Sequence, residues 1–526
     1  IMNFTEYAAC DGLALADLIA RGEVTVAEVT ACAQAAIDDR NPQLNAVLTD
    51  LDGQAYADDQ PFSGIPFLIK ELVLTAAGAK SRGGSRSTPD APAPADTNLM
   101  AAYRQAGLHL IGTTQTPEMG YNATTETVAF GPVHNPWKTG HSAGGSSGGS
   151  GAAVAAGLVP IAHANDGGGS IRIPASCNGI VGLKPTYGRV SRYGLVAYAS
   201  SLDQIGPVSK DVEDTALLLQ AIAGHDPRDS TSIDLPVPDY LAGLKDGIKG
   251  LKVGLAQEHF PAGLAAEIAN TAQHAAQALQ EAGAEIVDVQ LPVAGHPEYC
   301  IGAYYLIAMG EASANLSRYD GIKYGHRAES STDLQELYLK TRSEGFGEEV
   351  KRRIMLGTYA LSAGYYDAYY HKAQQVRTLI RQDFMKAYET VDALLTPTSP
   401  FVSFKAGEKT YKDANEKFID VENEAKFRQH YAQETIFAYH SYGNFEEIFI
   451  KANGNIELIN ASLNAGALGA KINGSGGGGC AQPICSRGHD HGRTLHCRPC
   501  RRVLCEQGGR EWLSDDHVRC VVGGPS

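Results

Sequence analysis

The sequence lacks an excess of basic charge, a long apolar run and an N-terminal segment of the secretory type. Its 526 residues include 44 Lys and Arg against 59 Asp and Glu, which gives a formal net charge of −15. Such an acidic chain is a poor match for nucleic acid or for an anionic membrane. No stretch reaches the roughly 18 continuous apolar residues of a membrane helix, and the first residues do not follow the basic-then-apolar pattern of a signal peptide. We therefore expect a cytoplasmic globular protein that makes no membrane contact.

Cysteine is scarce over most of the chain. Only Cys10, Cys32, Cys177 and Cys300 precede residue 480, and we expect them to be reduced thiols. The other six lie between Cys480 and Cys520, and the pair Cys497 and Cys500 has the spacing of zinc ligands. Since no second pair stands at a standard distance, we expect residues 486–526 to be disordered and to bind no metal. The alternative is a zinc module made of Cys485, His489, His491, Cys497, Cys500 and Cys505.

Helical and extended patterns alternate through the first four hundred residues. A capping box from Thr25 to Glu28 predicts a helix that ends near Asn41-Pro42. The apolar run 64–71 is typical of a buried strand, although it ends in Lys70 and Glu71. Further strands are expected at 45–49, 108–113, 251–255, 285–289 and 391–395, and helices at 99–107, 263–282 and 344–370. The alternation predicts an α/β fold in which one mixed β-sheet spans most of the chain, with helices on both faces.

Two glycine-rich segments carry serines: residues 144–149 read GGSSGG, and residues 167–170 read GGGS. Glycine at this density lets backbone N–H groups approach a bound group and stabilise a developing negative charge. A serine hydroxyl needs a base to act as a nucleophile, and a lysine kept neutral by burial can serve. Ser170 is therefore a candidate nucleophile and Lys70 a candidate base. The backbone N–H groups of Gly167, Gly168, Gly169 and Ser170 form the candidate oxyanion site. Without these segments, Lys70 would be interpreted as a side chain that reaches solvent at a strand end.

The runs GGSSGGSGAAVAAG, DGGGSIRIPASCNG and GLKPT resemble the motif of the amidase signature family. The resemblance implies the amidase-signature fold over residues 2–410. It also implies a triad in which Ser170 is the acyl nucleophile, Ser146 is a bridging serine after a cis peptide bond, and Lys70 is the general base. In the family mechanism, Lys70 draws a proton from Ser170 through Ser146, Ser170 attacks a carboxamide, and water hydrolyses the resulting ester.

From residue 187 to about residue 409 the sequence resembles one branch of that family, the A subunits of glutamyl-tRNA(Gln) amidotransferases. This resemblance implies that the substrate is glutamine and that Tyr304 and Arg353 bind it. Tyr305 or Arg352 takes their place if the alignment shifts by one residue. It also implies B and C subunits as partners, ATP and Mg used by a partner, tRNA bound only through the partner, and no cofactor in this chain.

The first part of the chain agrees less well with that branch. Gly167 stands where those A subunits have threonine. The segments 111–126 and 162–177 are more similar to stand-alone amidases, including the cyclic nylon-oligomer hydrolases. The alternative function is therefore hydrolysis of small, aryl or oligomeric amides without partner subunits.

Beyond residue 410 the sequence departs from the family, and residues 411–485 form an atypical C-terminal extension. Within it, residues 466–480 resemble the C-terminal glycine loop of galactokinase-type sugar kinases. Such kinases also need an N-terminal phosphate loop, which the glycine-rich residues 144–154 resemble only superficially. A sugar-kinase fragment is therefore a remote alternative.

Overall fold

The computed structural model describes residues 2–51, 54–72, 74–88, 90–261, 264–400 and 402–408, together with the backbone of 467–472 and 481–485. Six strands form one mixed sheet: β1 (Val47–Asp50), β2 (Ile65–Lys70), β3 (Leu108–Thr114), β8 (Ile161–Asp166), β9 (Val181–Gly182) and β10 (Gln204–Ser209). Three form a parallel sheet: β11 (Lys252–Ala256), β12 (Glu285–Val289) and β13 (Ala393–Leu395). Two-stranded ribbons are formed by β4 (Glu126–Thr127) with β5 (Gly131–Pro132), β6 (His134–Asn135) with β7 (Lys138–Ser142), and β14 (Ala467–Ile472) with β15 (Ala481–Cys485).

The helices occur in three groups along the chain. The first group is α1 (Phe4–Ala9), α2 (Gly12–Ala20), α3 (Val26–Leu44) and α4 (Asn98–Gln105). The second is η1 (Glu118–Gly120), α5 (Gly148–Ala155), α6 (Arg172–Asn178) and α7 (Val212–Ile222). The third is η2 (Gln257–His259), α8 (Ala266–Glu281), α9 (Pro297–Leu316), α10 (Leu334–Gly345), α11 (Glu348–Leu361), η3 (Asp367–His371) and α12 (Lys372–Ala387).

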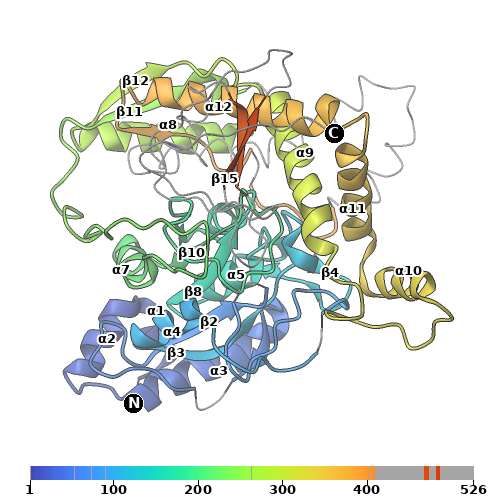
Figure 1. Cartoon of the computed structure of the whole chain (residues 1–526). Coiled ribbons are helices and arrows are strands. Elements are labelled where there is room, and N and C mark those ends of the chain that lie inside the picture. Colours follow the sequence, from blue (N-terminus) through green and yellow to red (C-terminus); the bar gives the residue numbers. More distant parts are fainter. Residues whose placement is uncertain are drawn as a thin grey trace, which may run out of the picture.

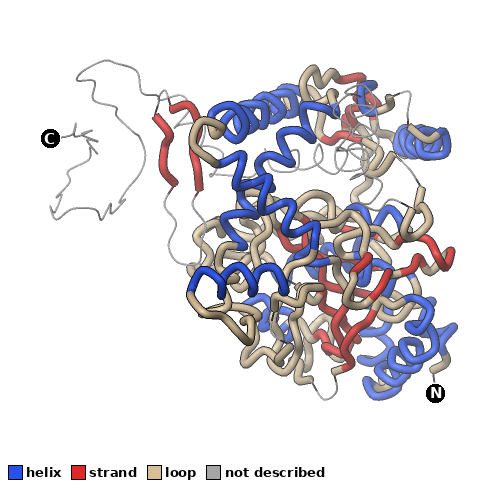
Figure 2. The backbone as a smooth tube through the Cα atoms, turned by 90° about the vertical axis from the view of Figure 1, so that its right-hand side faces the viewer, coloured by secondary structure: helices blue, strands red, loops and turns tan. Residues whose placement is uncertain are grey.

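The strands do not form the single sheet that the sequence predicted. The six-stranded sheet has the order β1-β3-β2-β8-β10-β9, while the later strands form a separate sheet with the order β12-β11-β13. Figure 1 shows the larger sheet in the lower part of the molecule and the smaller one at the top, and Figure 2 shows the same separation from the side. The prediction was wrong because helix–strand alternation indicates that sheets form, but it does not indicate which strands pair.

Strand β2 carries Lys70 into the centre of the larger sheet. All six of its residues are buried, and it runs parallel to both β3 and β8. Phe67 and Lys70 point to opposite faces, because they lie an odd number of positions apart on the strand. The Phe67 ring packs against Tyr103 of α4, with 4.7 Å between ring centroids, whereas Lys70 contacts the serines before α5. Helices therefore cover both faces of a mixed sheet, as predicted.

The helix that begins at the Thr25 capping box is longer than predicted. The Thr25 hydroxyl accepts the N–H of Glu28, and the Glu28 carboxylate accepts the N–H of Thr25, which confirms the capping box. The helix then continues through Pro42 and ends at Asn45, where φ is 55°. Proline has no N–H to donate to the carbonyl four residues earlier, and its ring crowds that carbonyl, but later residues of the helix keep their own N–H groups. The N–H of Asn45 still donates to the carbonyl of Asn41 at 2.7 Å, so the last turn forms around the proline.

A second hydrophobic core joins the three-stranded sheet to helices α9, α11 and α12. Helix α9 packs against both α11 and α12, with Ile307 of α9, Val350 of α11 and Phe384 of α12 fully buried between them. In Figure 1, α9 and α11 run from the level of the smaller sheet down toward the larger one. This arrangement brings Tyr304 and Arg353 to the region where the two glycine-rich segments lie.

The cysteines of the first three hundred residues are free thiols, as expected: Cys10, Cys32, Cys177 and Cys300. Among the described residues, no helix is long and apolar enough to cross a membrane. The kinase-like glycine loop and the cysteine-rich tail lie outside the described residues, apart from the backbone of β14 and β15, which pair antiparallel from Ala467 and Cys485. The sequence analysis did not predict this pair of strands.

Candidate active site

The Lys70 amine lies in contact with two serines. Lys70 is fully buried, and its Nζ is 2.6 Å from the Oγ of Ser146 and 3.0 Å from the Oγ of Ser147. The Ser147 hydroxyl also donates to the carbonyl of Asn165 at 3.2 Å. Lys70 therefore does not reach solvent at the strand end. Its amine is held by hydroxyl groups of the loop that leads into α5.

The peptide bond between Gly145 and Ser146 is cis, as the family resemblance implied. Gly145 packs directly on the preceding loop, because a Cβ on this residue would lie 2.7 Å from backbone atoms of Thr124. The next residue, Ser147, is the N-cap of helix α5, and its N–H donates to the carbonyl of Ser170 at 3.2 Å. The two glycine-rich segments, far apart in the sequence, are thus joined by a backbone hydrogen bond.

Ser170 lies in the turn between β8 and α6, which an ion pair holds in shape. The Asp166 carboxylate and the Arg172 guanidinium form a fork with two contacts of 3.0 Å. The same carboxylate accepts the N–H of Ile171 at 3.1 Å and the N–H of Gly169 at 2.7 Å. Burial alone would raise the pKa of Asp166, but the pairing with Arg172, the charge of Lys184 and the N–H of Ile171 lower it to about 2. Asp166 is therefore a permanent anion that fixes the turn.

This geometry corrects one member of the predicted oxyanion site. Gly167 and Gly168 line a pocket next to the turn, but the Gly169 N–H is donated to Asp166. A backbone N–H held by a carboxylate inside the turn is not presented to a substrate. Gly169 therefore stabilises the turn through this hydrogen bond, and its φ of 120° is one that favours glycine. Gly167, Gly168 and the N–H of Ser170 remain as candidates.

The same pocket contains the candidate nucleophile, the bridging serine and both predicted substrate residues. Ser146, Ser170, Tyr304 and Arg353 all line it. The Tyr304 hydroxyl reaches the turn closely, since a methyl group on Gly168 would overlap it. Tyr305 also lines the pocket, so the tyrosine register stays open. Arg352 does not line it, so only Arg353 of the two arginines faces the pocket.

Arg353 is held rigidly in this pocket. Its side chain is 4% exposed, its Nε donates to Glu349 at 2.6 Å, and its Nη1 donates to the hydroxyl of Tyr198 at 2.8 Å. The rings of Tyr121 and Tyr305 lie 5.6 and 5.4 Å from the guanidinium carbon, within the range of cation–π attraction. A guanidinium oriented in this way suits a carboxylate ligand by its planar, forked geometry.

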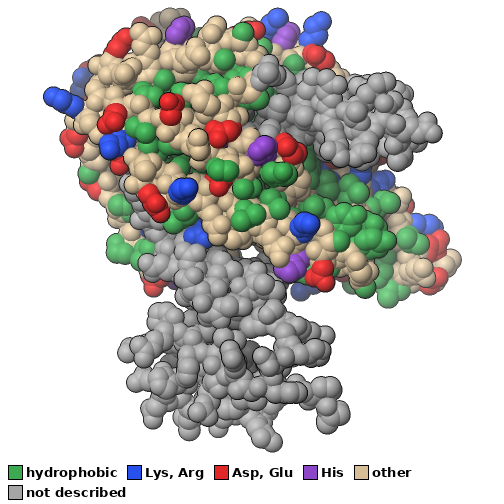
Figure 3. Space-filling view, turned by 90° about the horizontal axis from the view of Figure 1, so that it is seen from above, with side chains coloured by type: hydrophobic (Ala, Val, Ile, Leu, Met, Phe, Trp, Pro, Cys, Tyr) green, Lys and Arg blue, Asp and Glu red, His purple; other side chains and the backbone are tan. Residues whose placement is uncertain are grey.

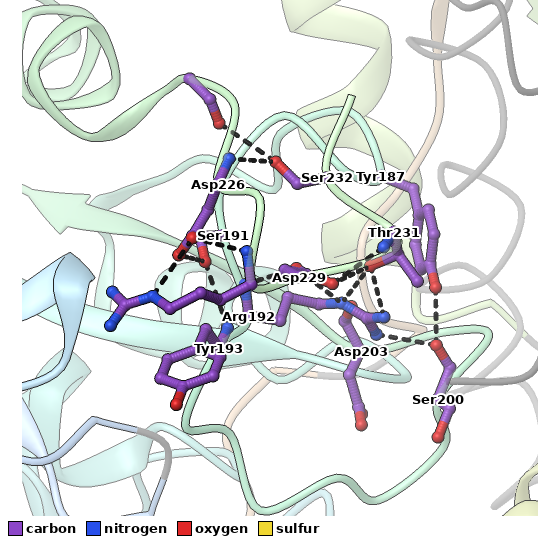
Figure 4. A network of polar contacts seen from close by, with 12 residues as sticks. Tyr187, Ser191, Arg192, Tyr193, Ser200, Asp203, Asp226, Asp229, Thr231 and Ser232 are labelled. Carbon is purple, nitrogen blue, oxygen red and sulfur yellow. Dashed lines mark hydrogen bonds and ion pairs between the residues drawn. The ribbon is translucent and has the colours of Figure 1, made fainter. Parts of the chain in front are cut away.

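Tyr198 and a further carboxylate, Asp203, reach the pocket on a loop between β9 and β10. Arg192 holds this loop by donating to the carbonyls of Ser200 at 2.7 Å and of Asp203 at 3.1 Å. Its other nitrogen donates to Thr231 at 2.7 Å. Figure 4 shows this network, in which Arg192 lies between Asp229, Thr231 and Ser200. The loop is therefore a fixed part of the pocket wall.

Burial has the largest effect on the pKa of the Lys70 amine. It lowers the pKa of Lys70 well below its ordinary value, while the nearby carboxylates of Asp166 and Asp203 act in the opposite direction. His163, whose Nδ1 accepts the backbone N–H of Lys70 at 3.3 Å, is also fully buried, and its pKa falls to about 3 because of burial and the neighbouring lysine. His163 is therefore neutral, and burial favours a neutral Lys70 that can accept a proton.

Sequence reasoning missed five residues of this site: Ser147, Asp166, Arg172, Tyr198 and Asp203. Asp166 and Arg172 could have been found, because two opposite charges flank GGGS in a segment of small and apolar residues. Ser147 is adjacent to Ser146, and only the three-dimensional contact shows that both touch Lys70. Tyr198 and Asp203 have no local pattern that marks them.

The fold and this pocket are those of an amide-hydrolysing enzyme. The family model described as Amidase matches residues 15–428, and the chain belongs to that family. The chain is 48% identical over 408 residues to the A subunit of glutamyl-tRNA(Gln) amidotransferase from Geobacter metallireducens, covering 75% of this chain and 83% of that protein. It is 50% identical over 408 residues to the protein of the same name from Moorella thermoacetica, with the same coverage of both chains. These matches decide the class of enzyme in favour of the amidase prediction over the sugar-kinase alternative.

Solved structures show the same fold. The crystal structure of the A subunit of glutamyl-tRNA(Gln) amidotransferase from Thermotoga maritima superposes with a TM-score of 0.65 and 34% identity, covering 84% of this chain and 86% of that one. The structure of 6-aminohexanoate cyclic dimer hydrolase superposes with a TM-score of 0.69 and 27% identity, covering 83% and 88%. Both branches that the sequence analysis distinguished are therefore represented among the structural neighbours.

Proposed function

We propose that this chain hydrolyses glutamine to glutamate and ammonia in the role of the A subunit of a glutamyl-tRNA(Gln) amidotransferase. The observation that carries the chemistry is the buried Lys70 amine, 2.6 Å from the hydroxyl of Ser146, in a pocket that also holds Ser170. The observation that carries the substrate is Arg353, a rigidly held guanidinium in the same pocket. The identity of 48–50% to A subunits supports the same choice.

In the proposed mechanism, the neutral Lys70 amine accepts the proton of Ser146 while Ser146 accepts the proton of Ser170. The Ser170 Oγ then attacks the side-chain carbonyl carbon of glutamine, and the developing oxyanion is stabilised by N–H groups of Gly167, Gly168 and Ser170. The protonated relay delivers its proton to the leaving nitrogen, which departs as ammonia. Water, deprotonated by the same relay, hydrolyses the acyl-enzyme ester and releases glutamate.

The proposal includes partner subunits. B and C subunits would accept the ammonia, and the ATP, Mg and tRNA would be bound by a partner, since an acidic chain of net charge −15 is a poor ligand for RNA. A cytoplasmic location follows from this role.

Helix α11 and the following turn also carry large apolar side chains on the outside: Met355 is 70% exposed, Tyr359 46% and Tyr365 43%. Figure 3 shows hydrophobic side chains gathered among charged ones on the face seen from above, and exposed groups of this kind often mark contacts with other proteins.

A second candidate, a stand-alone amidase for aryl or oligomeric amides, is favoured by the composition of the pocket. Its wall includes Tyr121, Tyr198, Tyr304, Tyr305 and Phe404, which suit a large apolar substrate. The superposition on 6-aminohexanoate cyclic dimer hydrolase supports this candidate as well.

An assay on two substrates separates the candidates. The purified full chain is tested on glutamine and on a neutral aryl amide, with and without B and C subunits of Geobacter metallireducens. The proposal expects ammonia release from glutamine that increases with the partner subunits, and little turnover of the aryl amide. Turnover of the aryl amide alone, unaffected by the subunits, would favour the second candidate.

The nucleophile is tested in the same assay. Ser170→Ala should remove turnover of every amide while leaving the circular dichroism spectrum and the melting temperature close to those of the unchanged chain. Turnover that persists in this variant would remove Ser170 from the mechanism.

A further inference from the structure

A carboxylate connects the loop beside the proton relay with the helix that carries Arg353. Both oxygens of Glu118, in η1, accept the N–H of Gly347 at 3.0 Å, and its Oε1 also accepts the hydroxyl of Ser85 at 2.7 Å. Gly347 is the N-cap residue of α11 and has no side chain that could cap the helix. Glu118 supplies this cap from a segment 229 residues away in the sequence.

The contact is well suited to fix the start of α11. The first N–H groups of a helix have no partner within it, and a negative charge is favourable at this end. Burial raises the pKa of Glu118, while the hydrogen bonds from Ser85 and Gly347 act in the opposite direction. These donors therefore take the place of water around the carboxylate. A Cβ on Gly347 would overlap the Oε2 of Glu118, so the carboxylate lies directly against the start of the helix.

The loop that follows Glu118 reaches the proton relay. Met119 and Gly120 line the pocket, and a Cβ on Gly120 would lie 3.3 Å from the Oγ of Ser146. Met119 has a φ of 52°, which is uncommon for a residue with a side chain. Its N–H donates to the carbonyl of Gly83 at 2.7 Å and its side chain is buried, so the surrounding structure holds this conformation. The loop is therefore fixed between Ser146 and Glu118.

Arg353 lies within the first two turns of α11, close to the contact between Gly347 and Glu118. The hydrogen bonds within a helix make so short a stretch move as one body, so a shift of the helix start displaces Arg353 as well. A group that orients a substrate must be held within about 0.5 Å of its productive position. The placement of the helix start therefore matters for the distance between Arg353 and the relay.

We propose that Glu118 is a positioning residue, which holds the start of α11 against the loop 118–121 and so sets the distance between Arg353 and Ser146. Glu118 does not line the pocket, so it acts through the helix and not on the substrate itself. This inference rests on the proposed function, in which Arg353 binds the carboxylate of glutamine. It adds the contact that aligns the substrate-binding helix with the groups that break the amide bond.

Two variants break the contact in different ways. Glu118→Ala removes the carboxylate, whereas Gly347→Ala keeps it but places a methyl group where Oε2 lies, at a φ of −71° that alanine readily adopts. With B and C subunits present, each variant should raise KM for glutamine by about tenfold, the loss expected from one hydrogen bond to a charged group. The value of kcat should stay nearly unchanged. Glu118→Gln should restore most of the KM, because its amide oxygen can accept the N–H of Gly347.

A double-mutant cycle distinguishes positioning from a general loss of stability. If Glu118 acts through Arg353, adding Glu118→Ala to Arg353→Gln should change KM for glutamine far less than Glu118→Ala does alone. The control is Glu348→Ala, which removes an exposed acid from the first turn of α11 and should leave KM unchanged. Gly347→Ala supplies the same cycle if Glu118→Ala does not fold.

The outcomes separate two kinds of failure. An unchanged KM in both alanine variants, effects that multiply in the cycle, or a failure of Glu118→Gln to restore KM would overturn the role of Glu118 while leaving glutamine hydrolysis intact. Absence of glutamine turnover in the unchanged chain with its partners would overturn the proposed function itself, and the role of Glu118 with it.

Discussion

Replacing Lys70 with methionine tests whether the buried amine is a neutral base. Methionine keeps most of the length of the side chain but has no amine. General base catalysis contributes about 10²- to 10⁴-fold to a rate, and residues that act as one relay lose similar amounts when any member is removed. Since the Nζ of Lys70 lies 2.6 Å from Ser146, Lys70→Met should lower kcat by about 10³- to 10⁴-fold, close to the loss in Ser170→Ala.

The same substitution should change how stability depends on pH. Burial lowers the pKa of Lys70 in the folded chain, whereas the unfolded side chain titrates near its ordinary value of about 10.4. Between these two pKa values the unfolded chain binds one more proton, so the stability of the unchanged protein rises with pH in this window. Each unit of pKa depression costs about 1.4 kcal/mol of folding free energy at pH values below the folded-state pKa. Lys70→Met has no such cost, so its stability relative to the unchanged chain should be greatest below the folded-state pKa of Lys70 and should decline as the pH rises toward about 10.4.

Urea denaturation of the two proteins at a series of pH values measures this difference, and steady-state ammonia release measures kcat. Lys249→Met is the control, because this lysine is exposed and should alter neither quantity. A stability difference that does not vary with pH would mean that Lys70 remains charged in the folded protein and cannot be the base. A loss in kcat of less than about tenfold would mean that another group accepts the proton.

Two further substitutions test the binding and positioning of the substrate and the amine. Arg353→Gln should raise KM for glutamine by about ten- to a hundredfold and leave KM for a neutral aryl amide unchanged. The control is Arg352→Gln, which should change neither KM because Arg352 shares the partner Glu349 but does not line the pocket. If Arg353→Gln weakened turnover of the two amides equally, the result would contradict a carboxylate contact. Ser147→Ala removes the 3.0 Å contact with Lys70 and should lower kcat by about tenfold, the effect of one hydrogen bond; a loss as large as that of Ser170→Ala would assign the bridging role to Ser147 in place of Ser146.

The sequence predicted the structure correctly where a feature depends on residues that are close together in the chain. The capping box at Thr25, the buried strand ending in Lys70 and the cis bond before Ser146 were all expected from short motifs or from the family resemblance, and the structure contains them. In each case the motif and the structural feature lie within a few residues of one another. Such local motifs predict the structure well because the backbone geometry that they specify involves only neighbouring residues.

The sequence was less informative where a feature depends on contacts between distant segments. The division into two sheets depends on which strands pair, and the place of Tyr198 and Asp203 in the pocket wall depends on a loop held by Arg192. The assignment of Gly169 to the oxyanion site failed for a similar reason. A GGGS segment shows that N–H groups are available, but only the position of Asp166 shows that one of them is already taken.

The pocket is built from two parts of the chain that lie on different structural units. The proton relay and the turn come from residues 70–170 on the six-stranded sheet, whereas Tyr304 and Arg353 come from helices α9 and α11, which pack with the three-stranded sheet. Changes within these helices can therefore alter which amide is bound without displacing the groups that break the bond. Because of this separation, mutation or recombination in the helices that bind the substrate can change the substrate range of this fold. The residues that carry out the reaction stay the same.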